Sequence, residues 1–378
     1  YDDDYYSFFS KRGKQLVPAS ISASLVERPS AAFHEVNIKP VSFEGDKRAF
    51  IGMYRGVKDP EAVKKGCLSN TTGKGYDPIA SLHIDIELEA GEEKTVIFML
   101  GEADNQQEAK ALIKKYNKVS AVDEALVEIN RFWDNLIEGL IVKTPDQAFN
   151  LMANVWLKYQ AISCRIWGKT AYYQSSGAFG FRDQLQDSQI FLPLDPKYTR
   201  KQILLHAEHQ FIDGTVYHWW HPISEIGLHS TISDNLLWLP FVLTNYLHET
   251  NDCALLESRE PFVDEKEPAS LYDHCCRALD KALERFSPRG LPLIGACDWN
   301  DGLSAVGLEM KGESVWLGHF LHYILSNFAV VAEKRNDHAH AQNYRDRARL
   351  LNEKLNTLAW DGEWYYRATK DNGEKIGS

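Results

Sequence analysis

Two carboxylates, Asp298 and Asp301, flank a tryptophan and an asparagine within the segment 295–302, Gly-Ala-Cys-Asp-Trp-Asn-Asp-Gly. A general acid must hold its proton near neutral pH, and an apolar ring beside a carboxyl group favours the protonated form by excluding water. Trp299 can supply such a ring. Asn-Asp and Asp-Gly are also common in turns, so the local pattern leaves both an acid site and a structural turn open.

A second polar cluster lies at 172–187, where glycines and aromatic residues lead into Arg182 and Asp183. An arginine beside a carboxylate can bind adjacent sugar hydroxyls through charge-assisted hydrogen bonds. Asp183 and Asp187 are four residues apart, which places both on one face of a helix. An Arg–Asp pair that caps a helix would give the same pattern, and both interpretations remain open.

Tyr-His-Trp-Trp-His-Pro at 217–222 places two tryptophans between two histidines. Aromatic rings stack on the apolar faces of sugars, so we predict that Trp219, Trp220 and His221 line a ligand cleft. His218 and His221 have no cysteine or carboxylate near them at a metal-binding spacing, so no metal site is predicted. The following stretch, 232–240, indicates a helix start capped by Ser233 or Asp234.

The elements that would position these residues change character near Gly101. Before it, alternating apolar and polar residues predict strands of an antiparallel sheet at 33–43, 48–55, 79–88 and 94–100. After it, helical periodicity predicts helices at 106–118, 120–139, 146–168, 199–212, 234–250, 270–286, 314–335 and 338–358. Because the loops between the later helices are long, polar and aromatic, they favour an α/α toroid over a plain helical bundle.

Composition excludes several classes of partner. The net charge is −11 without a Lys/Arg run, so we expect no nucleic acid and no anionic membrane surface. No apolar stretch reaches membrane-spanning length, and the first residues do not resemble a signal peptide. They also lack Met, so we expect that something was removed upstream. The six cysteines show no CxxC pair or zinc spacing, which favours the reducing cytoplasm.

Six motifs follow one another along the chain: Gly-Phe-Arg-Asp-Gln-Leu-Gln-Asp, His-Trp-Trp-His-Pro, Ser-Asp-Asn-Leu-Leu-Trp-Leu-Pro, Gly-Leu-Pro-Leu-Ile, Asp-Trp-Asn-Asp-Gly and Gly-Glu-Ser-Val-Trp-Leu-Gly. In this order they resemble glycoside hydrolase family 94, which includes cellobiose, cellobionic acid and chitobiose phosphorylases and the C-terminal part of cyclic β-1,2-glucan synthases. The resemblance runs from about Trp156 to the end of the chain. It is nearest to the glucan-synthase and cellobionic-acid branches.

The resemblance implies a multidomain architecture of β and α parts. We expect a β-sandwich portion at 1–103, a helical linker at 104–144 and an (α/α)6 barrel catalytic domain at 145–378 that is incomplete at its C-terminus. Family members are often homodimers, which makes a homodimer an expectation by analogy.

The resemblance also implies site roles. Asp301 would be the general acid, Trp299 would line the subsite of the transferred glucosyl unit, and Arg182 with Asp183 would hold its hydroxyls. The predicted substrate-binding residues are Tyr173, Gln174, Arg182, Asp183, Asp187, Trp219, Trp220, His221 and Trp299.

The implied reaction is an inverting phosphorolysis of a β-glucosidic bond. An inverting hydrolase needs an acid and a base, because the base activates water. A phosphorylase needs only the acid, since phosphate is already an anionic nucleophile. Asp301 would protonate the glycosidic oxygen while phosphate attacks C1 from the opposite face and gives α-D-glucose 1-phosphate. Asp298 would be structural, and inorganic phosphate would be the co-substrate without any cofactor.

The sequence departs from this family at two places. His229-Ser230-Thr231 stands where relatives carry Arg-Thr-Arg, and Asn235 replaces the second acid of Ile-Ser-Asp-Asp. The family's phosphate contacts come from a later part of the barrel, expected after Ser378. Two alternatives stay open: an inverting β-glucan hydrolase with Glu225 as its base, and a non-catalytic carbohydrate-binding domain of a cyclic β-1,2-glucan synthase-like protein. The linkage and the acceptor sugar also stay open.

Overall fold

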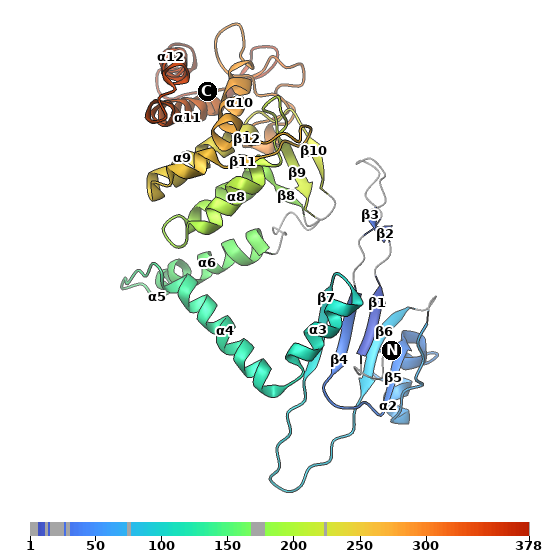
Figure 1. Cartoon of the computed structure of the whole chain (residues 1–378). Coiled ribbons are helices and arrows are strands. Elements are labelled where there is room, and N and C mark those ends of the chain that lie inside the picture. Colours follow the sequence, from blue (N-terminus) through green and yellow to red (C-terminus); the bar gives the residue numbers. More distant parts are fainter. Residues whose placement is uncertain are drawn as a thin grey trace. The chain divides into compact units, whose positions relative to one another are not determined.

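The computed structural model describes residues 31–73, 77–167, 178–222 and 225–377, together with the backbone of three short strands near the N-terminus. These strands are β1 (Ser7–Lys11), β2 (Lys14–Gln15) and β3 (Val26–Glu27). The chain forms two compact units, Tyr1–Trp133 and Asp134–Ser378, whose elements Figure 1 labels.

The first unit is built on antiparallel sheets. β4 (Ala31–Val36) lies between β1 and β7 (Phe98–Ala103), and β5 (Ser42–Asp46) pairs with β6 (Pro78–His83). The helix α3 (Gln106–Tyr116) buries Ala109 and Ile113 against Phe33 of the sheet. The helical part that follows the sheet thus begins with a helix that shares the core of the strands.

The prediction of a strand at 48–55 is wrong. Lys47–Ile51 forms the short helix α1, because the Asp46 side chain accepts a hydrogen bond from the Arg48 backbone N–H and starts a helical turn. The helix ends at Gly52, whose positive φ of 85° suits a residue without a side chain. A second short helix, α2 (Glu61–Lys65), follows.

The second unit consists mainly of helices. Its first helical stretch combines α5 (Gln147–Leu151) and α6 (Leu157–Gln160) with two wider π turns, Met152–Trp156 and Ala161–Trp167. The longer helices are α7 (Phe181–Ser188), α8 (Lys197–Ala207), α9 (Trp238–Thr250), α10 (Leu271–Leu283), α11 (Val315–Lys334) and α12 (His338–Lys354). The bounds of α8 to α12 confirm the helices predicted at these places to within about five residues, whereas α7 was not among the predicted helices. A helix that crosses the division between the units, α4 (Val119–Glu138), was also predicted.

One core holds the second unit together. α7 packs against α8 and α9, α9 packs against α10 and α11, and α11 packs against α12. Buried Leu, Ile, Val and aromatic side chains of all these helices form a single cluster with Trp220 and Phe179. Because apolar surface removed from water contributes about 25 cal/mol per Å², this continuous core is the main source of stability.

Short strands tie the loops to this helical core. β9 (Tyr217–His221) lies between β8 (Phe179–Gly180) and β10 (Ile226–His229), as Figure 1 shows. Three more pieces, β13 (Glu313–Ser314), β14 (Ala368–Thr369) and β15 (Lys375–Ile376), form a second small sheet. β11 (Arg259–Glu260) pairs with β12 (Ala269–Ser270). Because β8 leads into α7 and β13 leads into α11, these strands fix where both helices begin.

Among the described residues, one helix is long and apolar enough to cross a membrane by length and composition alone. This helix is α11, and 56% of its most apolar stretch is buried inside the protein. A buried core helix passes the same test, so the finding is weak.

The first unit contains a buried acid whose protonation should affect stability. Glu35 in β4 is 2% exposed, its Oε2 has no hydrogen-bond partner, and burial raises its pKa from 4.5 to about 7. The fold therefore favours the protonated form. The contribution of Glu35 to the stability of the fold is fully present below pH 4.5 and is lost as the pH rises through 7.

We expect Glu35→Gln to abolish this loss of stability at high pH, because glutamine carries no ionisable group. At pH 8 the variant should be more stable than the parent by on the order of 2 kcal/mol, and at pH 4 the two should be alike. Hydrogen–deuterium exchange of β4 and β7 measures this difference, with Glu87→Gln at an exposed position as the control. Equal protection of parent and Glu35→Gln at pH 8 would contradict the prediction.

Candidate active site

Arg182 is the centre of the polar cluster. It lies in the first turn of α7 and is only 6% exposed. Its Nη2 donates to Asp301 Oδ1 at 2.9 Å, and its Nη1 lies 3.3 Å from Asp234 Oδ2 and 3.4 Å from the backbone carbonyl of Asp298. One guanidinium thus connects three segments that are far apart in the sequence.

Asp183, the next residue, approaches the same guanidinium from α7 itself. Its Oδ1 lies 3.8 Å from Arg182 Nε. The preceding turn has room for this carboxylate because residue 180 is glycine: a Cβ on Gly180 would lie 2.4 Å from Asp183 Oδ2. The glycine before the arginine is therefore required for the placement of the Arg–Asp pair.

Asp234 is the fully buried partner of Arg182. It accepts a second hydrogen bond from Trp238 Nε1 at 2.9 Å. Burial raises its pKa to about 6, against the opposing effects of Arg182 and Trp238. The prediction that Ser233 or Asp234 caps a helix is wrong. Ser233 Oγ donates to the Cys297 carbonyl, and Asp234, which precedes the 3₁₀ turn Asn235–Leu237, makes no side-chain capping bond and neutralises the buried guanidinium instead.

The loop that carries Asp298 and Asp301 is fastened to the segment that carries Asp234. Ser233 donates from its backbone N–H to the Cys297 carbonyl at 3.0 Å, and Ile232 bridges to Gly295. Gly295 has a φ of 63°, and a Cβ there would lie 2.2 Å from the Thr231 carbonyl. The close approach of these two segments brings the Asp301 carboxylate and the Asp298 backbone carbonyl to Arg182.

Asp298 and Asp301 lie in opposite environments. Asp298 is 0% exposed: Arg367 binds both of its oxygens at 2.7 and 2.5 Å, and Ser314 Oγ donates to it at 2.5 Å. Such a carboxylate cannot meet a substrate, which agrees with the structural role predicted for it.

Asp301 opens a short 3₁₀ turn, Asp301–Leu303, and its side chain is 63% exposed. Oδ1 is held by Arg182 and by the Cys297 thiol, whose sulfur lies 3.8 Å away. Burial, with the negative charge of Asp301 as a further cause, raises the pKa of Cys297 to about 12, so this thiol stays protonated and can donate. The arrangement holds one oxygen of Asp301 in place and leaves the carboxyl accessible.

Aromatic rings lie beside this acid. Trp299 is 48% exposed, its Nε1 lies 3.4 Å from Gln186 Oε1, and its ring centroid is 6.1 Å from that of Trp316. Trp316 stacks on Phe320 and lies under the Arg367 guanidinium. The sequence analysis did not single out Trp316, although it lies within the quoted Gly-Glu-Ser-Val-Trp-Leu-Gly motif, two residues after Ser314.

The remaining predicted residues divide into three groups. Asp187 lies on α7 with Asp183, as expected from their spacing, and it binds Arg165. Burial raises the pKa of Asp187, against the lowering effect of Arg165. Tyr173 and Gln174 fall within 168–177, outside the described residues.

The cleft wall predicted from the two tryptophans is corrected in part. Trp219 and His221 are half-buried, with ring centroids 5.4 Å apart. Trp220 is 0% exposed and stacks on His209 at 3.9 Å inside the core. Its ring cannot line a ligand cleft, because the rings of Phe179, Phe181, His206 and His209 pack against it.

Glu225, the base considered for a hydrolase, and His229, which departs from the family pattern, both bind other side chains. Glu225 binds His209 Nε2 at 2.7 Å from a turn where its own φ is 56°. His229 Nε2 lies 2.9 Å from Thr215 Oγ1. Around the cluster, Arg182, Arg165 and Arg367 each bind a carboxylate. Among the described residues, none of these arginines is therefore placed as an evident phosphate ligand.

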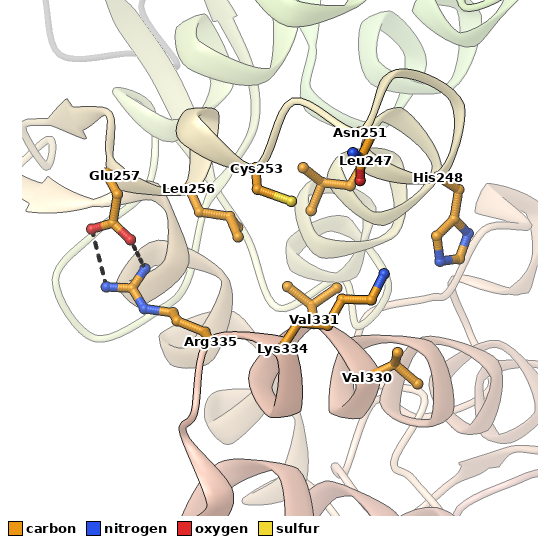
Figure 2. A pocket seen from close by; sticks show the side chains of 10 residues that line it. All are labelled: Leu247, His248, Asn251, Cys253, Leu256, Glu257, Val330, Val331, Lys334 and Arg335. Carbon is orange, nitrogen blue, oxygen red and sulfur yellow. Dashed lines mark hydrogen bonds and ion pairs between the residues drawn. The ribbon is translucent and has the colours of Figure 1, made fainter.

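A hollow of about 210 Å³ lies elsewhere, at the C-terminal ends of α9 and α11 (Figure 2). Leu247, Leu256 and Val331 give it an apolar lining, and Glu257 at its side is paired with Arg335 at 2.7 Å. Since its only carboxylate is already bound by a cation, this hollow offers no acid for catalysis. In the part of the chain that the structure describes, no group of His, Cys, Asp or Glu is placed to hold a metal ion.

A helical unit that presents an arginine–carboxylate cluster beside exposed tryptophan rings has the arrangement of a carbohydrate-active domain. Comparison with protein families gives the same class. Residues 132–378 match the catalytic domain of the glycosyl hydrolase 94 superfamily, and residues 12–119 match the glycosyl hydrolase 94 supersandwich domain. The chain therefore belongs to glycosyl hydrolase family 94.

Curated relatives include synthases and phosphorylases. The chain is 38% identical to the cyclic β-(1,2)-glucan synthase NdvB of Rhizobium meliloti, over 89% of its own length and 12% of that protein. It is 30% identical to a solabiose phosphorylase of Paenibacillus borealis and 31% identical to an N,N'-diacetylchitobiose phosphorylase of Vibrio proteolyticus, covering 93% and 90% of this chain. The chain spans 45% of the length of each phosphorylase.

Among solved structures, a bacterial glucoamylase in complex with acarbose shares the fold. The TM-score is 0.54 at 12% identity, covering 91% of this chain and 48% of that chain. At this identity the likeness concerns the fold alone.

We expect the Arg367–Asp298 pair to be essential for the stability of the second unit. Arg367→Met would leave a fully buried carboxylate without its cation, which costs about 3–5 kcal/mol. Unfolding in urea followed by tryptophan fluorescence reports this, since all tryptophans except Trp133 lie in the second unit.

Arg349→Met is the matched control for this experiment. Arg349 pairs with Asp346 on the surface, where both side chains are more than half exposed, so its loss should change the free energy of unfolding by less than about 1 kcal/mol. If Arg367→Met were no more destabilising than Arg349→Met, Asp298 would not depend on Arg367.

Proposed function

We propose that this chain carries the general acid of an inverting glycoside phosphorylase, which cleaves a β-glucosidic bond with inorganic phosphate and releases α-D-glucose 1-phosphate. One observation supports this above the others: of the two aspartates that flank Trp299 and Asn300, Asp301 is accessible, while Asp298 is fully buried and bound by Arg367. A reaction that needs one acid and no base fits a site with one accessible acid.

In the proposed mechanism Asp301 donates its proton to the glycosidic oxygen as the bond to C1 breaks. Phosphate attacks C1 from the opposite face, so the configuration at C1 inverts. Asp301 then carries a full negative charge. Arg182, 2.9 Å from Asp301 Oδ1, stabilises that charge as it develops and so lowers the barrier to proton transfer.

The glucosyl unit would be held by the same cluster. Arg182 and Asp183 together present a donor and an acceptor to neighbouring hydroxyls, and the exposed face of Trp299 stacks on the apolar face of the ring. Asp187, Trp219 and His221 remain proposed contacts. One relative is named for a cyclic β-(1,2)-glucan and two others for the phosphorolysis of solabiose and N,N'-diacetylchitobiose, so we test β-glucosides first.

We further propose that the helices of the second unit are part of an (α/α)6 toroid. The shared fold with the glucoamylase supports this, together with the successive packing of α7 to α12. The helical linker, the homodimer and the cytoplasmic location stay predictions.

The decisive experiment follows glucose 1-phosphate. The full-length protein that contains this sequence is incubated with cellobiose, cellobionic acid or β-1,2-glucooligosaccharides, with and without phosphate. We expect phosphate-dependent glucose 1-phosphate from at least one substrate. Asp301→Asn should reduce kcat by about 10²–10⁴-fold, because an amide is not acidic enough to transfer a proton to the glycosidic oxygen.

Glu309→Gln is the control for this substitution. Glu309 is an exposed acid a few residues along the same loop that pairs only with Lys311, so its loss should leave the rate unchanged. Free glucose released without phosphate would indicate a hydrolase. Sugar binding without any product would indicate a binding domain, and a full rate in Asp301→Asn would exclude Asp301 as the acid.

A further inference from the structure

His218 has no role in the site described so far, although its position brings it close to the cluster. In the sheet, Trp219 pairs with Gly180 and Trp220 with Phe179, so the residue before Trp219 lies beside the start of α7, where Arg182 and Asp183 stand. The charges that act on its ring are those of Arg182, Asp301 and Asp183. His218 is therefore a neighbour of the proposed acid and of the proposed sugar ligands.

Asn235 holds one edge of this ring. Its side chain is 2% exposed, and its Nδ2 lies 3.1 Å from His218 Nδ1. An amide NH₂ can only donate a hydrogen bond, so Nδ1 must accept with its lone pair. In a neutral imidazole the proton then resides on Nε2. The Asn235 Oδ1 has no partner among the described residues, so this contact uses the amide only as a donor.

The other edge of the ring is available. Within the described residues, His218 Nε2 makes no hydrogen bond, and it is not among the buried polar atoms that lack a partner. Burial lowers the pKa of His218, and the positive charge of Arg182 lowers it further, against the effects of Asp301 and Asp183. The ring is thus neutral near pH 7, with an N–H group for which the described part of the chain provides no acceptor.

We propose that Asn235 is a positioning residue that fixes His218 in the Nε2–H form, and that His218 donates this hydrogen to an oxygen of the glucosyl unit held by Arg182 and Asp183. The proposal rests on the proposed function for the identity of the sugar. It assigns a further binding residue to the site and gives a chemical reason for the amide at position 235.

Asn235→Asp tests the positioning role through the pH profile. A carboxylate at position 235 can only accept a hydrogen bond. It would therefore favour a proton on His218 Nδ1, and with it the charged ring. The charged ring still donates from Nε2, but the neutral ring would present a bare Nε2. The groups around the ring are Arg182 and Asp183 from α7, Asp301 from its 3₁₀ turn and residue 235 itself.

We expect kcat/KM of Asn235→Asp to fall about tenfold, relative to the parent, as the pH rises through the pKa of His218. In the parent protein His218 keeps a proton on Nε2 both below and above that pH, so the pH profile of the parent should lack this fall in kcat/KM. Superimposable profiles of parent and variant would overturn the positioning role.

Two substitutions of the histidine itself separate donation from shape. The amide nitrogen of His218→Gln can take the place of Nε2, whereas that of the shorter His218→Asn reaches only the place of Nδ1. We expect His218→Gln to stay within about threefold of the parent in kcat/KM and His218→Asn to lose about tenfold. Equal losses in the two variants would exclude donation from Nε2.

A readout without turnover keeps this proposal separate from the proposed function. In the full-length protein labelled with ¹⁵N-histidine, the His218 signals are identified by their absence in His218→Gln. We expect the Nε2–H tautomer in the parent and a shift of that proton when glucose is added to saturation. An Nδ1–H tautomer, a charged ring at pH 7 or no response to glucose would overturn the proposal, whereas these results without any glucose 1-phosphate would overturn only the proposed reaction.

Discussion

The second unit depends on a guanidinium that has been taken out of water. Removing a charge from water is costly unless it is paired and hydrogen-bonded, and Arg182 is almost fully buried. Its partners come from positions 52 and 119 residues further along the chain, Asp234 and Asp301. A single ion therefore requires that the start of α7, the segment before α9 and the acid loop occupy one place.

This constraint explains why two aspartates three residues apart have different chemistry. The pairing of Arg182 with the loop brings the backbone of Asp298 inward, where Arg367 and Ser314 neutralise its side chain. The turn that follows then leads Asp301 outward. The buried acid fastens the loop to Arg367 and Ser314, and the exposed acid stays accessible for the proton transfer that we propose. Rigid placement of the reacting group is what a positioned general acid requires.

The sequence predicted the parts of this structure that are local. The change from strands to helices near Gly101 and the common face of Asp183 and Asp187 follow from periodicity, and the structure bears them out. The strand expected at 48–55 was wrong because a side-chain cap at Asp46 outweighs a short apolar alternation. Tyr-His-Trp-Trp-His could not show which tryptophan is buried, since that depends on the helices behind β9.

Side-chain pairs between residues far apart in the sequence could not be predicted, because no local sequence pattern marks them. Arg367 lies 69 residues from Asp298, and neither is marked in the sequence as the partner of the other. The pairing of His218 with Asn235 joins two motifs that were interpreted separately, one as a cleft wall and one as a helix start. The motif order indicated the family, but only the geometry shows which atoms of these two motifs face each other.

The two departures from the family pattern can be understood together as a change in charge. The resemblance implies Arg-Thr-Arg at the place of His229-Ser230-Thr231 and a second acid at the place of Asn235. In the cluster, the carboxylates of Asp183, Asp234 and Asp301 all lie close to the single guanidinium of Arg182. Burial raises the pKa of Asp234 to about 6. A further carboxylate at 235 would repel an incoming anion at a site with fewer cations. An amide there removes that repulsion and still holds His218, so the loss of an acid partly offsets the loss of the arginines.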